Sequence, residues 1–436
     1  MKLNHIYKSI ACGVLLAMTA TSCDLDYNPV DTYSDVTEGV NKTDEKPIFN
    51  SVQDVETSMV TLHKKFRDRQ EHWYVDKLLI GDAHSDNAYA GTTGAEVVPY
   101  ETNSIEGSNS VLKRDWDRFL GDIAVANRII VGCDQLKALS ESERGKYQSQ
   151  AKIFRAMVMF DMVRLWGNFP VITTVGGDIT EDNVEEMYPT YFPPQNTAEE
   201  AYAQIEKDLT EAVENPNTPT NDTSDKSILT KSVARAMLAK VYAEKPLRDY
   251  AKVIKYADEL AADGFDLVED FSDLWAYDTE KKDCRVRNTK EAILEAHFPP
   301  GSGNWCTWMF GRNLSNWDES FTWAKWITPS RDLIRLYEEQ GDTKRYNESV
   351  VWYDCGWSNY YPADHYAFMY KCRSAFNSII YLRYADILLL KAEAKIMGEA
   401  PDLNGGGDII ERPTPHHPPH PQPRRTGQTS TKHPQQ

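Results

Sequence analysis

Hydrophobic residues recur at steps of three and four along most of the chain up to residue 264, which is the period of an α-helix with one buried face. Helices of this kind are expected over 51–68, 111–139, 147–166, 197–214, 230–244 and 249–263. Thr197 and Glu200 form a capping box, and Gly167 and Gly264 follow the last turns of their helices. The pattern therefore predicts a mostly α-helical body.

The segment 230–264 is similar to a degenerate tetratricopeptide repeat, which is a pair of antiparallel helices. The residues that fit the repeat are Leu238, Ala239, Tyr242, Tyr250 and Ala257. Helix pairs of this type stack side by side and build a scaffold rather than a reaction centre. We therefore expect a helix-pair scaffold over 51–264.

Between 265 and 375 the helical period fades and Gly and Pro residues become frequent. Seven of the eleven tryptophans lie between Trp305 and Trp357. A long, aromatic-rich segment between scaffold helices is where binding residues concentrate. Residues 376–398 then give a short strand-like apolar run and a returning scaffold helix, so 265–375 is expected to be a loop-rich ligand-binding insertion.

The N-terminus has the pattern of a targeting signal. Lys2 and Lys8 form a basic region, an apolar run follows, and small residues precede Cys23. This arrangement resembles a bacterial lipobox, which implies a signal peptide over 1–22 and acylation of Cys23 as the lipid anchor. Residues 23–50 then form a lipidated tether. The alternative is an ordinary secretory peptide with an incidental cysteine.

Charge and cysteine usage exclude several classes of protein. The 48 Lys and Arg residues against 66 Asp and Glu residues give a net charge of −18, which disfavours nucleic acid and anionic lipid surfaces as partners. No C-x-x-C spacing occurs, which argues against a zinc site and a regular disulfide framework. The cysteines after Cys23 are Cys133, Cys284, Cys306, Cys355 and Cys372. No metal site and no cofactor are predicted.

The aromatic segment carries the main candidate chemistry. Sugar rings present C–H faces that pack on flat indole rings, while their hydroxyls need polar side chains at the rim. The aromatic residues are Trp305, Trp308, Phe310, Trp317, Phe321, Trp323 and Trp326, followed by Trp352, Trp357, Tyr360 and Tyr361. Polar residues interleave with them: Arg312, Asn313, Asn316, Asp318 and Lys325. About half of these rings are expected to be core.

A second polar loop, 81–94, contains small residues around Asp82, His84, Asp86, Asn87 and Tyr89. One alternative is a metallophosphoesterase site, but the further Asp-x-His and Gly-Asn-His elements of such a site are missing. The other is a capped, hydrogen-bonded loop. The expected ligand-binding residues of both segments are Trp305, Trp308, Trp317, Tyr89, Asn87, Asp86, Arg312 and Asn313.

Six segments in order resemble the SusD/RagB family of outer-membrane glycan-binding lipoproteins. They are the lipobox with DLDYNP, RLWGNFPVIT from Arg164, TAEEAYAQIEKDL from Thr197, LTKSVARAMLAKVY from Leu229, GDTKRYNESVVW from Gly341 and YLRYADILLLKAEA from Tyr381. The resemblance covers the chain from Cys23 to about Met397. It departs from the family after the last segment, where a Pro- and His-rich tail over 399–436, expected to be disordered, replaces a further helix pair.

The resemblance implies an α-helical, SusD-like body with tetratricopeptide-like pairs and a loop-rich binding side. It further implies anchoring in the outer membrane through acyl chains, facing the cell exterior, and delivery of glycans to a SusC-like TonB-dependent transporter. No catalytic residue is expected, because nucleotide-binding and nucleophile-elbow motifs are missing. Two alternatives remain open: a peptide- or glycopeptide-binding import protein of the same family, and a glycoside hydrolase that uses some of the many carboxylates.

Overall fold

A computed structural model describes residues 47–411 of the 436-residue chain, except 92–93, 95, 177–184, 186–191, 279, 281–282, 299–302, 307–325, 356–357, 372 and 375. The chain divides into two units, Met1–Pro47 and Ile48–Gln436. The fold described here is that of the second unit. The expected signal peptide, the anchor Cys23 and residues 412–436 of the expected tail lie outside the described residues.

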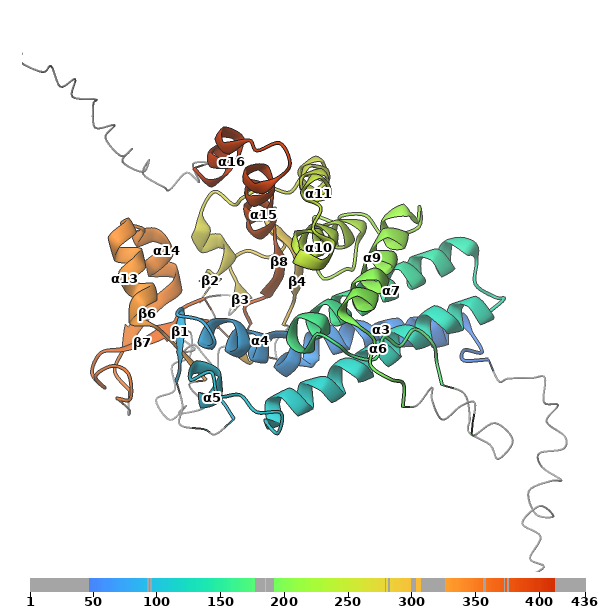
Figure 1. Ribbon diagram of the computed structural model, residues 1–436, viewed down its shortest axis with the longest axis horizontal. Helices are drawn as coiled ribbons and strands as arrows, with labels where there is room; N and C mark the ends of the chain where they lie inside the picture. The colour runs from blue at the N-terminus through green and yellow to red at the C-terminus, as the bar shows by residue number, and fades with distance from the viewer. Residues whose placement is uncertain are drawn as a thin grey trace, which may run out of the picture. The chain divides into compact units, whose positions relative to one another are not determined.

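Helices dominate the described part of the chain, which confirms the predicted fold class (Figure 1). The long helices are α3 (Val52–Asp68), α6 (Ser110–Gln135), α7 (Glu141–Trp166), α9 (Ala198–Glu214), α10 (Lys231–Ala243), α11 (Tyr250–Ala262) and α15 (Tyr384–Met397). The short helices are α4 (Asp76–Leu78), α5 (Val98–Glu101), α13 (Arg331–Gln340), α14 (Thr343–Ser349) and α16 (Leu403–Ile410). Single 3-10 turns occur at η3 (Lys245–Leu247) and η4 (Phe271–Leu274).

Capping residues fix where the long helices begin. The Thr197 hydroxyl accepts a hydrogen bond from the Glu200 backbone N–H, and Glu200 reaches back to the N–H of Thr197, which confirms the predicted capping box. Ser140 and Glu143 form the same arrangement before α7. Helix α7 therefore starts at Glu141, six residues earlier than the hydrophobic pattern predicted, because its first turns are polar and carry no apolar period.

The long helices pack in sequence as antiparallel pairs around one hydrophobic core. Helix α7 lies between α6 and α9, and α10 pairs with α11, which in turn contacts α15 (Figure 1). A buried ion pair crosses this core: Arg155 of α7 donates to both carboxylate oxygens of Asp208 on α9, at 2.7 and 2.8 Å. The same guanidinium donates to Asn127 Oδ1 of α6 at 2.7 Å, so one side chain joins three helices.

Among the described residues, short strands form four two-stranded antiparallel sheets. The pairs are β1 (Ala88–Ala90) with β5 (Ile327–Pro329), β2 (Tyr277–Asp278) with β3 (Asp283–Cys284), β4 (Ala292–Ala296) with β8 (Ile379–Arg383), and β6 (Val350–Tyr353) with β7 (Tyr366–Met369). The strand-like run and final helix predicted over 376–398 are confirmed as β8 and α15. Through β1–β5 and β4–β8, the insertion is tied back to the scaffold.

Some elements differ from the prediction. The segment after α3 is helical, with two π-helical turns, η1 (Glu71–Val75) and η2 (Leu79–Ala83), around α4. The pattern missed it because four consecutive residues, His72 to Val75, are buried, so no single face is apolar. Helices α13 and α14 lie inside the segment expected to be irregular. Helix α13 has an apolar face formed by Leu333, Ile334 and Tyr337, so its period was available in the sequence and was overlooked.

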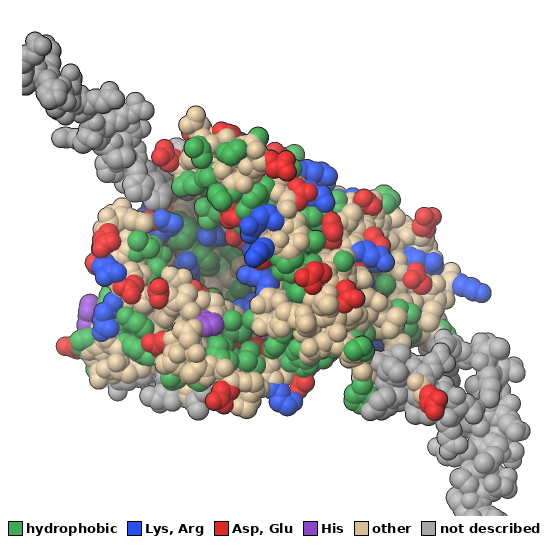
Figure 2. Space-filling model, viewed as in Figure 1, with side chains coloured by type: hydrophobic (Ala, Val, Ile, Leu, Met, Phe, Trp, Pro, Cys, Tyr) green, Lys and Arg blue, Asp and Glu red, His purple; other side chains and the backbone are tan. Residues whose placement is uncertain are grey.

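The tail expected to be disordered from 399 includes a helix, α16, so that boundary is wrong. Asp402 caps α16 by accepting from the Gly405 N–H at 2.8 Å, and Gly406 lies against Ile396 of α15. Hydrophobic side chains gather at the surface of this helix pair, at the top of Figure 2. Those with large exposed fractions are Leu389, Met397, Leu403 and Ile410. In the part of the chain that the structure describes, no helix has the length and apolar character to cross a membrane.

Candidate functional site

A second, smaller hydrophobic cluster forms where β1, β5, α13 and the β6–β7 hairpin meet. Its buried members are Ile334, Val350, Tyr361, Tyr366, Ala367 and Phe368. Several aromatic side chains at its edge are only half-buried. We call Tyr89, Trp352, Tyr360, Tyr361 and His365, together with Arg331, the aromatic patch.

Two parallel ring pairs define the patch. Tyr89 from β1 stacks on Tyr360, with ring centroids 4.6 Å apart and planes 6° from parallel. Trp352 from β6 stacks on His365 at 4.2 Å and 3°. Tyr361 lies edge-on to Trp352 at 5.2 Å. Because tyrosine and tryptophan rings stay rigid in such contacts, their flat faces are held in fixed orientations.

Hydrogen bonds anchor the polar ends of these rings. The Tyr360 hydroxyl lies 2.7 Å from Glu101 Oε2 and 2.8 Å from the Ala90 carbonyl oxygen, and burial together with Glu101 raises its pKa. The Tyr361 hydroxyl donates to the Pro329 carbonyl at 2.7 Å, and burial raises its pKa as well. Both phenols are therefore neutral, so these groups position rings and do not act as bases.

Arg331, the first residue of α13, provides the cation of the patch. Its guanidinium lies 4.8 Å from the Tyr361 ring and 5.9 Å from the Tyr89 ring, and it donates to the Tyr360 carbonyl. The backbone N–H of Arg331 also donates to the Tyr89 hydroxyl at 3.1 Å. The side chain is exposed and forms no ion pair with a described residue. The patch thus combines flat rings with a polar rim.

The structure brings part of the predicted site to this patch. Tyr89 is in the first ring pair, and Asp86 and Asn87 are exposed just before it. The backbone carbonyl oxygens of Asp86 and Asn87 accept bonds from the Ser330 hydroxyl and the Ser330 N–H, respectively. The 81–94 loop is therefore joined to the start of α13.

The predicted Trp305 lies elsewhere. It is half-buried against the main core, its backbone N–H donates to Gln70 Oε1 at 2.8 Å, and it forms no ring pair with Tyr89. Four other predicted residues fall outside the described part of the chain: Trp308, Arg312, Asn313 and Trp317. Their role remains a prediction.

Two residues of the patch, Arg331 and His365, were not singled out from the sequence, and neither was Glu101, which binds the Tyr360 hydroxyl. Each is polar, and its position depends on pairing between segments far apart in the chain. The Pro329-Ser330 pair before Arg331 is a helix-start signal that was available in the sequence. Across the described residues, no group of three or more His, Cys, Asp or Glu side chains could hold a metal ion.

A buried carboxyl pair joins α4 to α6. Asp76 of α4 and Asp115 of α6 hydrogen-bond to each other and are almost fully buried. Arg114 forms ion pairs with both. Burial, followed by the neighbouring Asp76 carboxyl group, raises the pKa of Asp115 to about 9, and burial also raises the pKa of Asp76. The pair therefore shares a proton at neutral pH.

This proton makes the stability of the fold depend on pH. The pKa of Asp115 is higher in the folded chain than in the unfolded chain, so the folded state binds more protons and loses stability as pH rises from about 4 to about 9. In Asp115→Asn an amide replaces the protonated carboxyl group, so stability should fall less as pH rises. Urea unfolding at several pH values measures how the free energy of unfolding changes with pH in the wild type and in the variant. The same change with pH in both proteins would contradict a shared proton.

Comparisons with known proteins agree with this architecture. Residues 33–243 match the SusD-like family described as "Starch-binding associating with outer membrane". A SusD-like protein of Bacteroides ovatus is 25% identical over 309 residues, which are 68% of this chain and 50% of that protein. Over residues 33–243 the chain is therefore similar to the SusD/RagB family. This SusD-like chain spans about half the length of the curated relative that it matches.

Solved structures share the SusD-like fold. A surface glycan-binding protein A from Bacteroides uniformis superposes with a TM-score of 0.66 at 16% identity, covering 83% of this chain and 79% of that one. A surface glycan-binding protein A from Bacteroides fluxus superposes with a TM-score of 0.63 at 19% identity, covering 85% of this chain and 83% of that one. A laminarin-binding SusD-like protein gives 0.62 at 18% identity, covering 84% of each chain. At these identities the likeness establishes the fold.

Proposed function

We propose that this SusD-like chain binds oligosaccharides or polysaccharides at the aromatic patch and delivers them to a SusC-like TonB-dependent transporter. It acts as a non-catalytic lipoprotein on the outer face of the outer membrane. The observation that carries the proposal is the pair of parallel ring stacks, half-exposed on a rigid scaffold and rimmed by Arg331, Asp86 and Asn87.

The chemistry of the patch fits a saccharide. The C–H faces of a sugar ring pack on Tyr or Trp faces, and its hydroxyls find donors in Arg331 and acceptors in the exposed Asp86 and Asn87 side chains. The names of similar proteins point the same way, since three of them include glycan or laminarin binding.

A native affinity gel against a panel of polysaccharides and peptides tests the proposed ligand class. We expect one or more polysaccharides to retard the chain, with no release of reducing sugar. Retardation by peptides alone would favour the import of peptides or glycopeptides, and cleavage of the polysaccharide would identify a glycoside hydrolase. Co-purification of a large β-barrel protein from solubilised outer membranes tests the transporter partnership.

The Cys23→Ala variant tests the proposed anchor. Without the thiol there is no acylation site, so the variant should move from the membrane fraction to the soluble fraction. Acyl chains hold a protein to a bilayer by about 0.8 kcal/mol per buried CH₂ group, so their loss should be evident. Fractionation of cells followed by immunoblotting measures the shift. Cys133→Ala is the control, because Cys133 is a buried residue of α6, and full membrane retention of Cys23→Ala would contradict the anchor.

A further inference from the structure

A cleft of about 600 Å³ opens between α3, α7 and the loop 219–228, and none of its lining residues belongs to the aromatic patch. The helices contribute His63, Lys146, Tyr147 and Gln150, and the loop contributes Thr220 and Asp222 among others. Its volume is within the usual range for small-molecule sites, and its walls mix polar with apolar surface. Neither the family match nor the proposed function assigns a role to it.

The walls of the cleft offer hydrogen-bonding groups of every kind. Lys146 is exposed, forms no ion pair with a described residue, and supplies donors only. Asp222 supplies acceptors: the backbone N–H and hydroxyl of Ser224 bind its Oδ1 at 2.7 and 2.6 Å and lower its pKa, which keeps it ionised. The hydroxyl of Thr220 can both donate and accept.

The helical wall adds a neutral imidazole. Burial lowers the pKa of His63, so at neutral pH its ring carries one donor and one acceptor nitrogen, one of which pairs with Gln150. Gln150 is itself held by a bond from its Nε2 to the Lys146 carbonyl at 3.2 Å. Next to these polar groups, Tyr147 and Met59 provide a small apolar floor.

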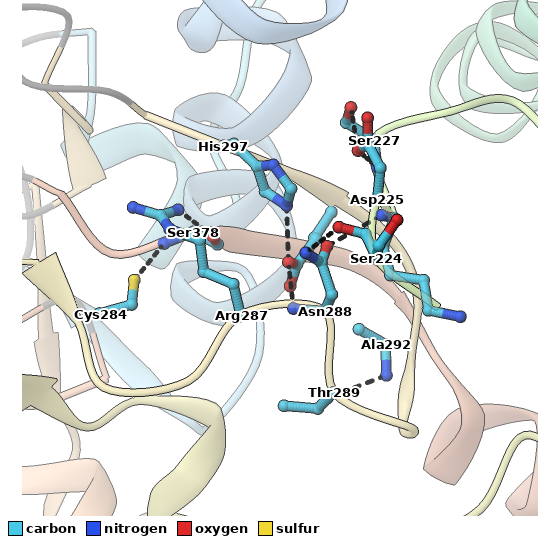
Figure 3. A network of polar contacts seen from close by, with 12 residues as sticks. Ser224, Asp225, Ser227, Cys284, Arg287, Asn288, Thr289, Ala292, His297 and Ser378 are labelled. Carbon is cyan, nitrogen blue, oxygen red and sulfur yellow. Dashed lines mark hydrogen bonds and ion pairs between the residues drawn. The ribbon is translucent and has the colours of Figure 1, made fainter. Parts of the chain in front are cut away.

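The loop wall is fixed in place by a polar network (Figure 3). Asn288 Oδ1 accepts from the Lys226 N–H at 2.9 Å, and Asn288 Nδ2 donates to the Ser224 carbonyl at 2.6 Å. Buried Glu295 accepts from the Asn288 N–H at 2.8 Å and pairs with His297 at 2.7 Å. A wall held by these bonds loses little freedom when a ligand binds.

We propose that this cleft is a second saccharide-binding site, which accepts one or two sugar units. A sugar hydroxyl both donates and accepts, so it can pair with Lys146, Asp222 and His63 alike, whereas a purely apolar or singly charged ligand would leave some of them unsatisfied. The proposal rests on the proposed glycan function but uses different residues. Two sites on one chain would strengthen binding to a polymer more than to a disaccharide.

Titration calorimetry with maltose, cellobiose, laminaribiose, xylobiose and the dipeptide alanyl-alanine tests the cleft. The variants are Lys146→Gln with Asp222→Asn in one chain, Tyr360→Ala at the aromatic patch, and Lys113→Gln with Asp117→Asn as the control. Lys113 and Asp117 are an exposed ion pair of α6 outside the cleft, so their replacement, like that of Lys146 and Asp222, leaves the net charge unchanged. Melting curves show that each variant is folded.

We expect a disaccharide to bind at two sites in the wild type and in the Lys113→Gln, Asp117→Asn control, and at one site in Tyr360→Ala. In the cleft variant, affinity at the cleft should fall about tenfold, which corresponds to the loss of one or two hydrogen bonds to charged groups, so that one strong site remains. A single site that survives in the cleft variant and is lost in Tyr360→Ala would overturn the cleft and leave the proposed function intact. A single site that is lost only in the cleft variant would support saccharide binding in the cleft and would overturn saccharide binding at the aromatic patch. Binding of the dipeptide alone would overturn both.

Discussion

Replacing Asp208 with alanine is expected to lower the free energy of unfolding by about 3–5 kcal/mol. The change leaves the Arg155 guanidinium, which is only 4% exposed, without the carboxylate that now receives two of its hydrogen bonds. It also removes the acceptor for the Gln204 amide at 2.9 Å. An uncompensated charge in the middle of the α6–α7–α9 core cannot be hydrated without opening the helices.

Glu211→Ala provides the matched control for this prediction. Lys152 and Glu211 form an ion pair of 2.7 Å between the same two helices, but both side chains are partly exposed. Breaking such a pair costs about 0–1 kcal/mol, because water replaces the lost partner. Urea unfolding of both variants at the same pH measures the difference. Equal losses would mean that Arg155 reaches water in the folded chain and that the pair is not part of the core.

Replacing Tyr360 with alanine is expected to weaken glycan binding about tenfold or more. Stacking on one aromatic ring contributes about 1–3 kcal/mol, by analogy with bases on aromatic side chains, and 1.4 kcal/mol is a factor of ten. The change also removes the ring on which Tyr89 stacks, with centroids 4.6 Å apart, so the Tyr89 ring loses the contact that fixes its orientation. Calorimetry with the polysaccharide that retards the chain most strongly measures the loss.

Tyr360→Phe separates the ring from its hydroxyl. Phenylalanine keeps the flat face but gives up the contacts of the hydroxyl with Glu101 and the Ala90 carbonyl. We expect this variant to retain most of the affinity. Melting curves for both variants check that the patch still folds. An alanine variant that binds as tightly as the wild type would place the ligand elsewhere, and the predicted platform of Trp305 and Trp308 would be examined next by the same substitutions.

The scaffold helices could be predicted from the sequence because the residues that specify each helix lie within it or next to its ends. The apolar steps of α3, α9, α10 and α11, and the capping residues Thr197 and Glu200, specify each helix without reference to the rest of the chain. The π-helical turns around α4 escaped prediction because burial on all sides leaves no period. Helix α16, with three consecutive glycines, shows no helix propensity at all and depends on packing against α15.

The candidate site was predictable only in part. The density of aromatic residues predicted a site built on flat rings, and Tyr89, Trp352 and Tyr360 were each noticed as aromatic or loop residues. They come together through the local β6–β7 hairpin and through the pairing of β1 with β5, which joins residues more than 200 positions apart. The bond from the Arg331 N–H to the Tyr89 hydroxyl spans 242 positions. Such pairing follows from tertiary packing and leaves no local signal.

The central claim is that a saccharide binds on the ring faces of the aromatic patch. A crystal structure of the chain with an oligosaccharide of the retarding polysaccharide tests it most directly. The account predicts a sugar ring against Tyr89, Tyr360 or Trp352, with its hydroxyls within hydrogen-bond distance of Arg331 or Asn87. A saccharide bound away from all of these residues, with the patch empty at saturating concentration, would contradict the claim.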